Sequence, residues 1–119
     1  VLLGIKDTDT VEDLNYILRK LLNLRIYDDE NGVMNKSIMD AGGSILLISQ
    51  FTLYGDVRKG NRPSYSTAAG FEEGRALYVI EELKNSQLKI ETGSYGADMK
   101  VSLINNGPVT ILLDSEKVF

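Results

Sequence analysis

Histidine and cysteine are both absent from this chain of 119 residues. Without histidine, no Ser–His or Cys–His nucleophile pair can form, and the commonest metal ligand is missing. Without cysteine, disulfides, thiolate catalysis and zinc–thiolate sites are excluded, and the absence is compatible with a reducing cytosol. Any chemistry must therefore come from carboxylates, lysines, hydroxyls, backbone N–H groups or the substrate itself.

Long apolar runs and an excess of positive charge are absent as well. No apolar run reaches the ~18 residues of a membrane-spanning helix. The net charge is −4 and the pI about 4.8, so general affinity for nucleic acid is not expected, although a local basic patch is compatible with these values. Apolar residues make up 43% of the chain, enough for the core of one domain over residues 1–119. The opening "VLLGI" lacks a basic leader and is interpreted as the second half of a core strand, with residues missing upstream, rather than as a signal peptide.

Two segments have the apolar periodicity of helices. Leucines and isoleucines recur every three or four residues over residues 11–24, after a capping pair formed by Thr10 and Asp13. A second helix is predicted over residues 72–86, with Leu77, Ile80 and Leu83 buried. The acidic run "DDENG" predicts a hairpin turn, and it lacks the oxygen spacing of a calcium loop, so no metal site is predicted there.

Three later segments are predicted as strands. Residues 44–53 look like a strand buried on both faces, and residues 99–104 and 109–114 follow as further strands separated by "NNGP". Helices and strands therefore alternate in a pattern that predicts a mixed α/β domain with helices packed on a sheet.

The predicted strand 44–53 carries a polar pair, Ser49 and Gln50, in an apolar setting. Burying an amide without hydrogen-bond partners is costly. One interpretation is that a neighbouring backbone satisfies Gln50, or that the strand reaches the sheet edge there. The other is that the strand end opens a pocket in which Ser49, Gln50 and backbone N–H groups bind a carbonyl or hydroxyl. Ser49 or Thr52 would need a base to act as nucleophile, and none stands at a recognisable spacing.

The loop after this strand, "RKGNR", carries the densest positive charge of the chain. Arg58, Lys59 and Arg62 are interpreted either as solvated side chains or as phosphate contacts at a pocket rim. For "NNGPVT", the ordinary interpretation is a turn, and cis bonds before proline occur in only about 5% of cases.

Two long segments together resemble the signature regions of the D-aminoacyl-tRNA deacylase family, also called D-tyrosyl-tRNA deacylases. These are "SQFTLYGDVRKGNRPSYSTAA" and "GSYGADMKVSLINNGPVT"; "LLNLRIYDDENGVMNKSIMD" and "ILLDS" are similar to the family as well. The resemblance covers essentially the whole chain. It implies an α/β fold of layered mixed and antiparallel sheets with two main helices. It also implies a cytoplasmic homodimer without metal or organic cofactor, which hydrolyses the ester of D-aminoacyl-tRNA, or of glycine mischarged on tRNA(Ala).

The resemblance also implies roles for particular residues. The implied catalytic segment is Ser49, Gln50, Phe51 and Thr52, with backbone N–H groups near Gln50 and Phe51 holding the scissile carbonyl oxygen. The implied tRNA-binding residues are Arg58, Lys59 and Arg62. Gly107 and Pro108 match a Gly-cisPro pair that enters the partner subunit's site and excludes L side chains. The full set of implied substrate-binding residues is Leu53, Met99, Asn106, Gly107, Pro108, Val109 and Thr110.

Two questions stay open at this point. The attacking group is either Thr52 or water assisted by the ribose 2′-hydroxyl of the substrate, and the missing base favours the second. The resemblance also implies about thirty further residues at the start, which this chain lacks; either it is part of a longer protein, the interpretation favoured by the apolar "VLLGI", or it is a fragment without the family's fold and activity. Rival interpretations are a nucleic-acid-binding module, which predicts basic tails unlike the closing "DSEKVF", and an inactive dimeric scaffold, which the intact "SQFT" and "GPVT" motifs disfavour.

Overall fold

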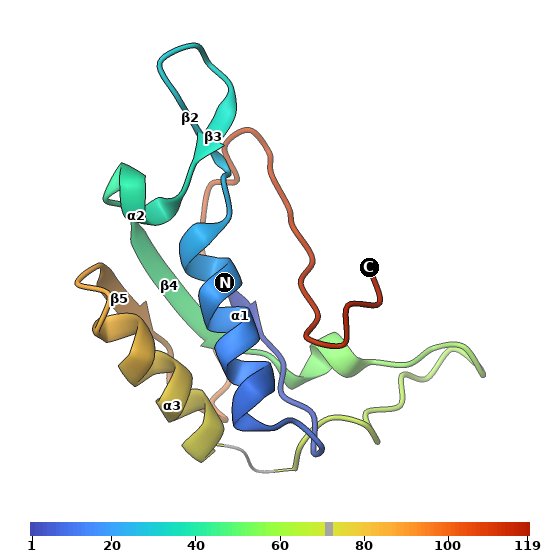
Figure 1. Cartoon of the computed structure of the whole chain (residues 1–119). Helices are drawn as coiled ribbons and strands as arrows, with labels where there is room; N and C mark the ends of the chain where they lie inside the picture. The colour runs from blue at the N-terminus through green and yellow to red at the C-terminus, as the bar shows by residue number, and fades with distance from the viewer. Residues whose placement is uncertain (71–72) are drawn as a thin grey trace.

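The computed structural model describes residues 1–70 and 73–119. It is a mixed α/β protein with one parallel sheet, one antiparallel hairpin and two main helices (Figure 1). In chain order the elements are β1 (Leu2–Leu3), α1 (Val11–Asn23), β2 (Tyr27–Asp28), β3 (Met34–Lys36), α2 (Ile38–Ala41), β4 (Ser44–Ser49), the 3-10 turn η1 (Phe51–Tyr54), α3 (Glu73–Lys84) and β5 (Lys89–Thr92). None of the helices in the described residues is long and apolar enough to span a membrane.

The central sheet has the order β1-β4-β5, and both neighbouring pairs are parallel. Parallel neighbours need long crossovers, which here contain α1 and α3. Both helices lie on the same side of the sheet (Figure 1). The core between them contains Leu18 of α1, Leu47 of β4, and Val79 and Leu83 of α3, of which the last two have no exposed surface.

The first predicted helix is confirmed to within one residue, because its start is set locally. The backbone N–H and the hydroxyl of Thr10 both donate to Asp13 Oδ2, at 2.7 and 2.9 Å. The second predicted helix is confirmed from Glu73 to Lys84; its expected first residue, at position 72, lies outside the described residues.

The buried face of α3 differs from the prediction. Ala76, Val79 and Leu83 form the stripe that faces the core. Leu83 is buried as predicted and Ile80 is half-buried, but Leu77 is 50% exposed. Leu77 is one position away from the stripe, and on a helix of 3.6 residues per turn this rotates it by about 100° toward solvent.

The predicted turn at "DDENG" is confirmed as the connection of the β2–β3 hairpin. The Asp29 carboxylate accepts hydrogen bonds from the N–H groups of Asn31 and Val33, at 2.9 and 3.0 Å. Gly32 has a φ of 74°, a left-handed conformation that glycine adopts without steric cost.

The strand predicted over residues 44–53 is shorter than expected. β4 ends at Ser49, and the chain then tightens into η1, where the Leu53 N–H donates to the Gln50 carbonyl at 3.2 Å. Residues 50–53, predicted as part of the strand, therefore lie outside it. β4 is also not buried on both faces, since Leu46 is 43% exposed.

The strands predicted over residues 99–104 and 109–114 are not present. Residues 100–119, here called the C-terminal arm, contain no strand or helix and are drawn as a plain trace (Figure 1, orange to red). Leu103 is 72% exposed and Ile104 is 93% exposed. An alternating sequence becomes a strand only when a neighbouring strand satisfies its N–H and C=O groups, and among the described residues of this chain the arm has no such neighbour. Sequence analysis missed β5, whose signal is the alternation around Ile90, and the short α2.

Candidate active site

A cavity of about 580 Å³ lies at the end of β4. Three of the proposed catalytic residues, Ser49, Gln50 and Phe51, contribute to its wall. The opposite wall comes from the turn after β5, including Tyr95 and Met99. A smaller cavity of about 120 Å³ shares Ser49 and Tyr95 with it and continues toward α3. The polar pair is therefore at the end of a strand and beside a cavity, as the pocket interpretation expects.

The Gln50 backbone is already used in the fold. Its N–H donates to the Leu3 carbonyl at 2.7 Å, which extends the pairing of β1 with β4. The first N–H groups of a helical turn have no acceptor within the turn, and Phe51 and Thr52 occupy those positions in η1. The donors that the turn can offer to a substrate oxygen are therefore those of Phe51 and Thr52, rather than that of Gln50.

The Gln50 side chain is half-buried and is satisfied by a neighbouring side chain. Its Nε2 donates to the Thr52 hydroxyl oxygen. This partner was not among the two alternatives considered from sequence. A neutral amide cannot take up a proton from Thr52, so the contact gives the hydroxyl no general base. Thr52 and Leu53 are exposed on η1 and do not line the cavity.

Two tyrosines in the cavity wall were missed by sequence analysis. Tyr65 contacts Phe51 edge to face, with ring centroids 5.2 Å apart and an interplanar angle of 70°. Tyr95 lies in the wall on the β5 side. The available signal was an aromatic residue next to Gly96 in one loop, and two residues after Pro63 in the other, since loops often carry binding residues.

Met99, predicted to bind substrate, is packed closely against Gly93. A Cβ added to Gly93 would lie 2.4 Å from Met99 Sδ and 3.1 Å from Ile48 Cδ1. Glycine at position 93 therefore lets the Met99 side chain lie in the cavity wall.

The basic loop follows η1 as a narrow hairpin. Asp56 and Ser64 pair through two backbone hydrogen bonds of 2.8 and 2.9 Å. The Arg58 guanidinium forms a bidentate contact with Asp56, at 2.9 and 2.6 Å, and this contact lowers the pKa of Asp56 to about 2. Within the described part of the chain, Lys59 and Arg62 form no ion pair, so they are the loop cations that a phosphate would meet without competition.

The segment from Asn106 to Thr110 lies apart from the cavity of its own chain. Every residue from position 101 to 112 is exposed, and none from 106 to 110 lines the cavity as the structure describes it. The Gly107–Pro108 peptide bond is trans, so the cis bond implied by the resemblance is not present. An exposed X–Pro bond favours trans by about 0.5–1 kcal/mol, which accounts for the isomer seen in this single chain.

Taken together, the fold and the cavity define a mixed α/β protein in which a 3-10 turn with free backbone N–H donors lies beside a cavity at the end of a strand. The model of the family described as D-Tyr-tRNA(Tyr) deacylase matches residues 1–114, and the chain belongs to this family of hydrolases. It is 56% identical to proteins named D-aminoacyl-tRNA deacylase from Thermosipho africanus (strain TCF52B) and Clostridium botulinum (strain Loch Maree / Type A3). Both alignments cover 100% of this chain and 81% of the relative.

A solved structure supports the same fold. The protein named "c-Myc DNA Unwinding Element Binding Protein" superimposes with a TM-score of 0.85 at 44% sequence identity. The match covers 92% of this chain and 76% of that one. The match to the family and the identity to its named members show that the protein is a hydrolase, one of the deacylases that act in translation quality control.

Proposed function

We propose that this enzyme hydrolyses the ester of D-aminoacyl-tRNA, and of glycyl-tRNA(Ala), to free amino acid and tRNA. The observation that carries the proposal is the cavity at the end of β4, with η1 beside it, in a chain 56% identical to D-aminoacyl-tRNA deacylases. The substrate is a cytoplasmic molecule, which agrees with a chain that contains no cysteine.

In the proposed reaction, water adds to the ester carbonyl carbon and the carbonyl oxygen becomes an oxyanion. The N–H group of Phe51 stabilises this oxyanion, because Phe51 lines the cavity and its N–H has no acceptor within η1. The tetrahedral intermediate then releases the ribose 3′-oxygen, which takes up the proton lost by the water. The 2′-hydroxyl of the ribose, next to the leaving oxygen, positions the water and relays the proton. The contact between Thr52 and the Gln50 amide supports this route over attack by Thr52.

The basic loop is proposed to contact the phosphates near the acceptor end of the tRNA. Tyr65 connects the loop to the cavity, since it directly follows the hairpin and its ring packs on Phe51. Lys59 and Arg62 supply the contacts with most of their charge available. Arg58 contributes less, because Asp56 neutralises it.

Selection against L-aminoacyl-tRNA is proposed to come from a second copy of the chain. The Gly107–Pro108 segment is exposed and lies outside its own cavity, while the arm around it exposes apolar side chains such as Ile104 and Leu112. In a homodimer, each arm would bring this segment to the partner's cavity, where rigid backbone excludes an L side chain by steric clash. The proposal keeps the cross-subunit position and does not depend on the isomer of the peptide bond.

The test compares release of tyrosine from D-Tyr-tRNA and from L-Tyr-tRNA, with a chelator present. Selective release from the D ester supports the proposal. If the folded protein releases tyrosine from neither ester but retards tRNA in a gel, the proposal is wrong and a binding module is the better description. The observation that favours this second candidate is the likeness to a solved protein whose name describes DNA binding.

A further inference from the structure

The C-terminal arm is attached to the rest of the molecule at two places. The first is the cavity wall, where Met99 and Val101 lie. The second is a compact turn over residues 114–117, here called the C-terminal latch. Its Lys117 N–H donates to the Asp114 carbonyl at 2.9 Å, and its Glu116 N–H donates to the Asp114 carboxylate at 2.8 Å. The Gly107–Pro108 segment lies between the two attachments.

The latch contacts the loop before α1 and the first turns of that helix. The Glu116 carboxylate forms an ion pair with Lys6 Nζ, and the Lys6 side chain is only 27% exposed. Hydrogen bonds from Thr10 lower the pKa of the Asp13 carboxyl, and the hydroxyl of Ser115 in the latch lowers it further. The Lys117 ammonium lies 5.4 Å from the centre of the Tyr16 ring, within the range of a cation–π contact. The side chains of three consecutive latch residues, Ser115, Glu116 and Lys117, therefore lie against the loop before α1 and the first turns of that helix.

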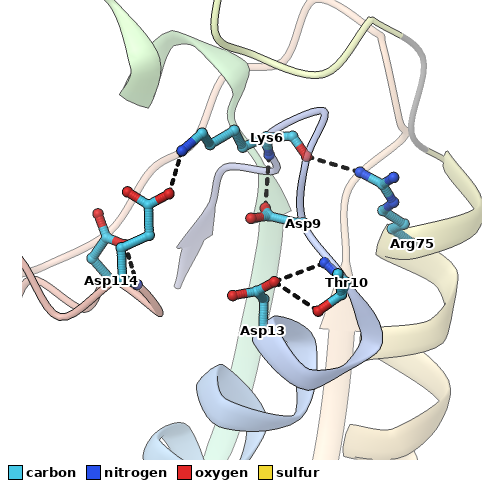
Figure 2. Close-up of polar contacts among 7 residues, drawn as sticks. Lys6, Asp9, Thr10, Asp13, Arg75 and Asp114 are labelled. Atoms are coloured by element: carbon cyan, nitrogen blue, oxygen red, sulfur yellow. Dashed lines mark hydrogen bonds and ion pairs between the residues drawn. The ribbon is translucent and has the colours of Figure 1, made fainter.

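Lys6 is held firmly by its own backbone (Figure 2). Its N–H donates to Asp9 Oδ2 at 2.8 Å, and its carbonyl accepts from Arg75 Nη1 of α3, also at 2.8 Å. Lys6 also pairs with Ala68, which lines the cavity. The Lys6 backbone is therefore fixed relative to the cavity, and its side chain extends from this point to Glu116.

The latch also lies close to η1. Burial and the charges of Asp9, Asp114 and Glu116 raise the pKa of Tyr54, the last residue of η1, to about 12. The Tyr54 ring packs against Gly4, so closely that an added Cβ would lie 3.1 Å from its Cε2. The charges of the latch therefore act on the last residue of η1, and the latch ends the arm that carries Gly107 and Pro108.

We propose that Lys6 and Glu116 are positioning residues for substrate selection: their ion pair fixes the far end of the arm and so sets where the Gly107–Pro108 segment lies. This inference rests on the proposed function. Neither residue touches the substrate. Both act through the arm, which within residues 103–112 has no buried side chain to hold it in place.

The test removes the ion pair while keeping the length of the side chains. Lys6→Met and Glu116→Gln are each expected to raise L-Tyr-tRNA hydrolysis relative to D-Tyr-tRNA hydrolysis by roughly two- to five-fold, the size expected of one partly exposed ion pair. The charge exchange Lys6→Glu with Glu116→Lys is expected to restore selectivity. Lys36→Met is the matched control, because it removes a 2.7 Å ion pair with Glu30 on the β2–β3 hairpin, away from the latch.

A second readout does not depend on activity. Because the chain contains no cysteine, spin labels can be attached at cysteines that replace Asn105 in the arm and Glu82 on α3, both of them exposed. The spread of distances between the two labels is expected to be broader in Lys6→Met than in the wild-type protein, and unchanged in Lys36→Met. An unchanged spread in Lys6→Met would overturn the inference, whatever the enzyme does. Unchanged selectivity in Lys6→Met, while Pro108→Ala loses selectivity, would also overturn it and leave the proposed function intact. Absence of D selectivity in the wild-type protein would overturn the proposed function instead.

Discussion

The sheet with its two helices and the C-terminal arm are built from similar residues but behave differently. In the helical layer, Val79 and Leu83 have no exposed surface, and every strand has a hydrogen-bonded neighbour. In the arm, Leu103 and Ile104 are mostly exposed, and the backbone has no ladder partner within the part of the chain that the structure describes. Apolar alternation therefore shows only that a segment is suited to pairing. Whether it pairs depends on what is placed beside it.

The largest difference between the two regions is expected in the free energy of unfolding, when a leucine in each is replaced with alanine. Leu83→Ala should lower the free energy of unfolding by about 2–5 kcal/mol, because it opens a cavity in a fully buried site. Leu103→Ala should change the stability of the isolated chain by less than about 0.5 kcal/mol. Urea denaturation of both variants measures this. If Leu103→Ala is costly only at high protein concentration, the arm is buried between two copies; if it is costly at every concentration, the arm packs on its own chain.

The next largest effect is expected in substrate selection. Pro108→Ala should raise hydrolysis of L-Tyr-tRNA by about 10-fold or more, because a rigid backbone obstacle is loosened. The melting temperature should stay close to that of the wild-type protein, since Pro108 is exposed. Ser102→Ala, also in the arm, is the control. Unchanged selectivity in a folded protein would show that this segment takes no part in the site.

The basic loop should give a smaller effect that depends on salt. Replacing Lys59 and Arg62 with alanine should raise KM for the tRNA substrate and reduce the slope of log KM against log salt by about one unit for each phosphate that is no longer bound. Arg58→Ala should do less, because Asp56 already neutralises that side chain. A KM and salt dependence equal to those of the wild-type enzyme would identify the loop as merely solvated.

The smallest effect is expected at Thr52. Thr52→Ala should retain activity within about 10-fold of the wild-type rate, because the hydroxyl has no base and backbone N–H donors survive the substitution. Single-turnover deacylation measures it. Loss of nearly all activity, with an unchanged melting temperature, would make Thr52 the nucleophile.

The features predicted best from the sequence are those set by residues that lie close together along the chain. The start of α1 depends on Thr10 and Asp13, and the hairpin turn depends on Asp29 and Gly32, so both were predicted within a residue. The end of β4 lies at a cavity, which is the arrangement that one of the two interpretations of Ser49 and Gln50 described. The use of the Gln50 N–H was not predictable, because its acceptor is distant in sequence. The absence of strands in the arm was not predictable for a similar reason, because alternation of apolar residues does not identify which strand lies beside a segment.

The parallel pairing of β1 with β4 has a consequence for the order in which the protein becomes active. This pairing forms one side of the cavity, and it joins strands that the whole α1 and β2–β3 region separates along the chain. Non-local pairing of this kind forms late, after helices that need only local contacts. A newly synthesised chain with formed helices but without this pairing has no cavity floor. The cavity is therefore complete only in molecules in which this non-local pairing has formed.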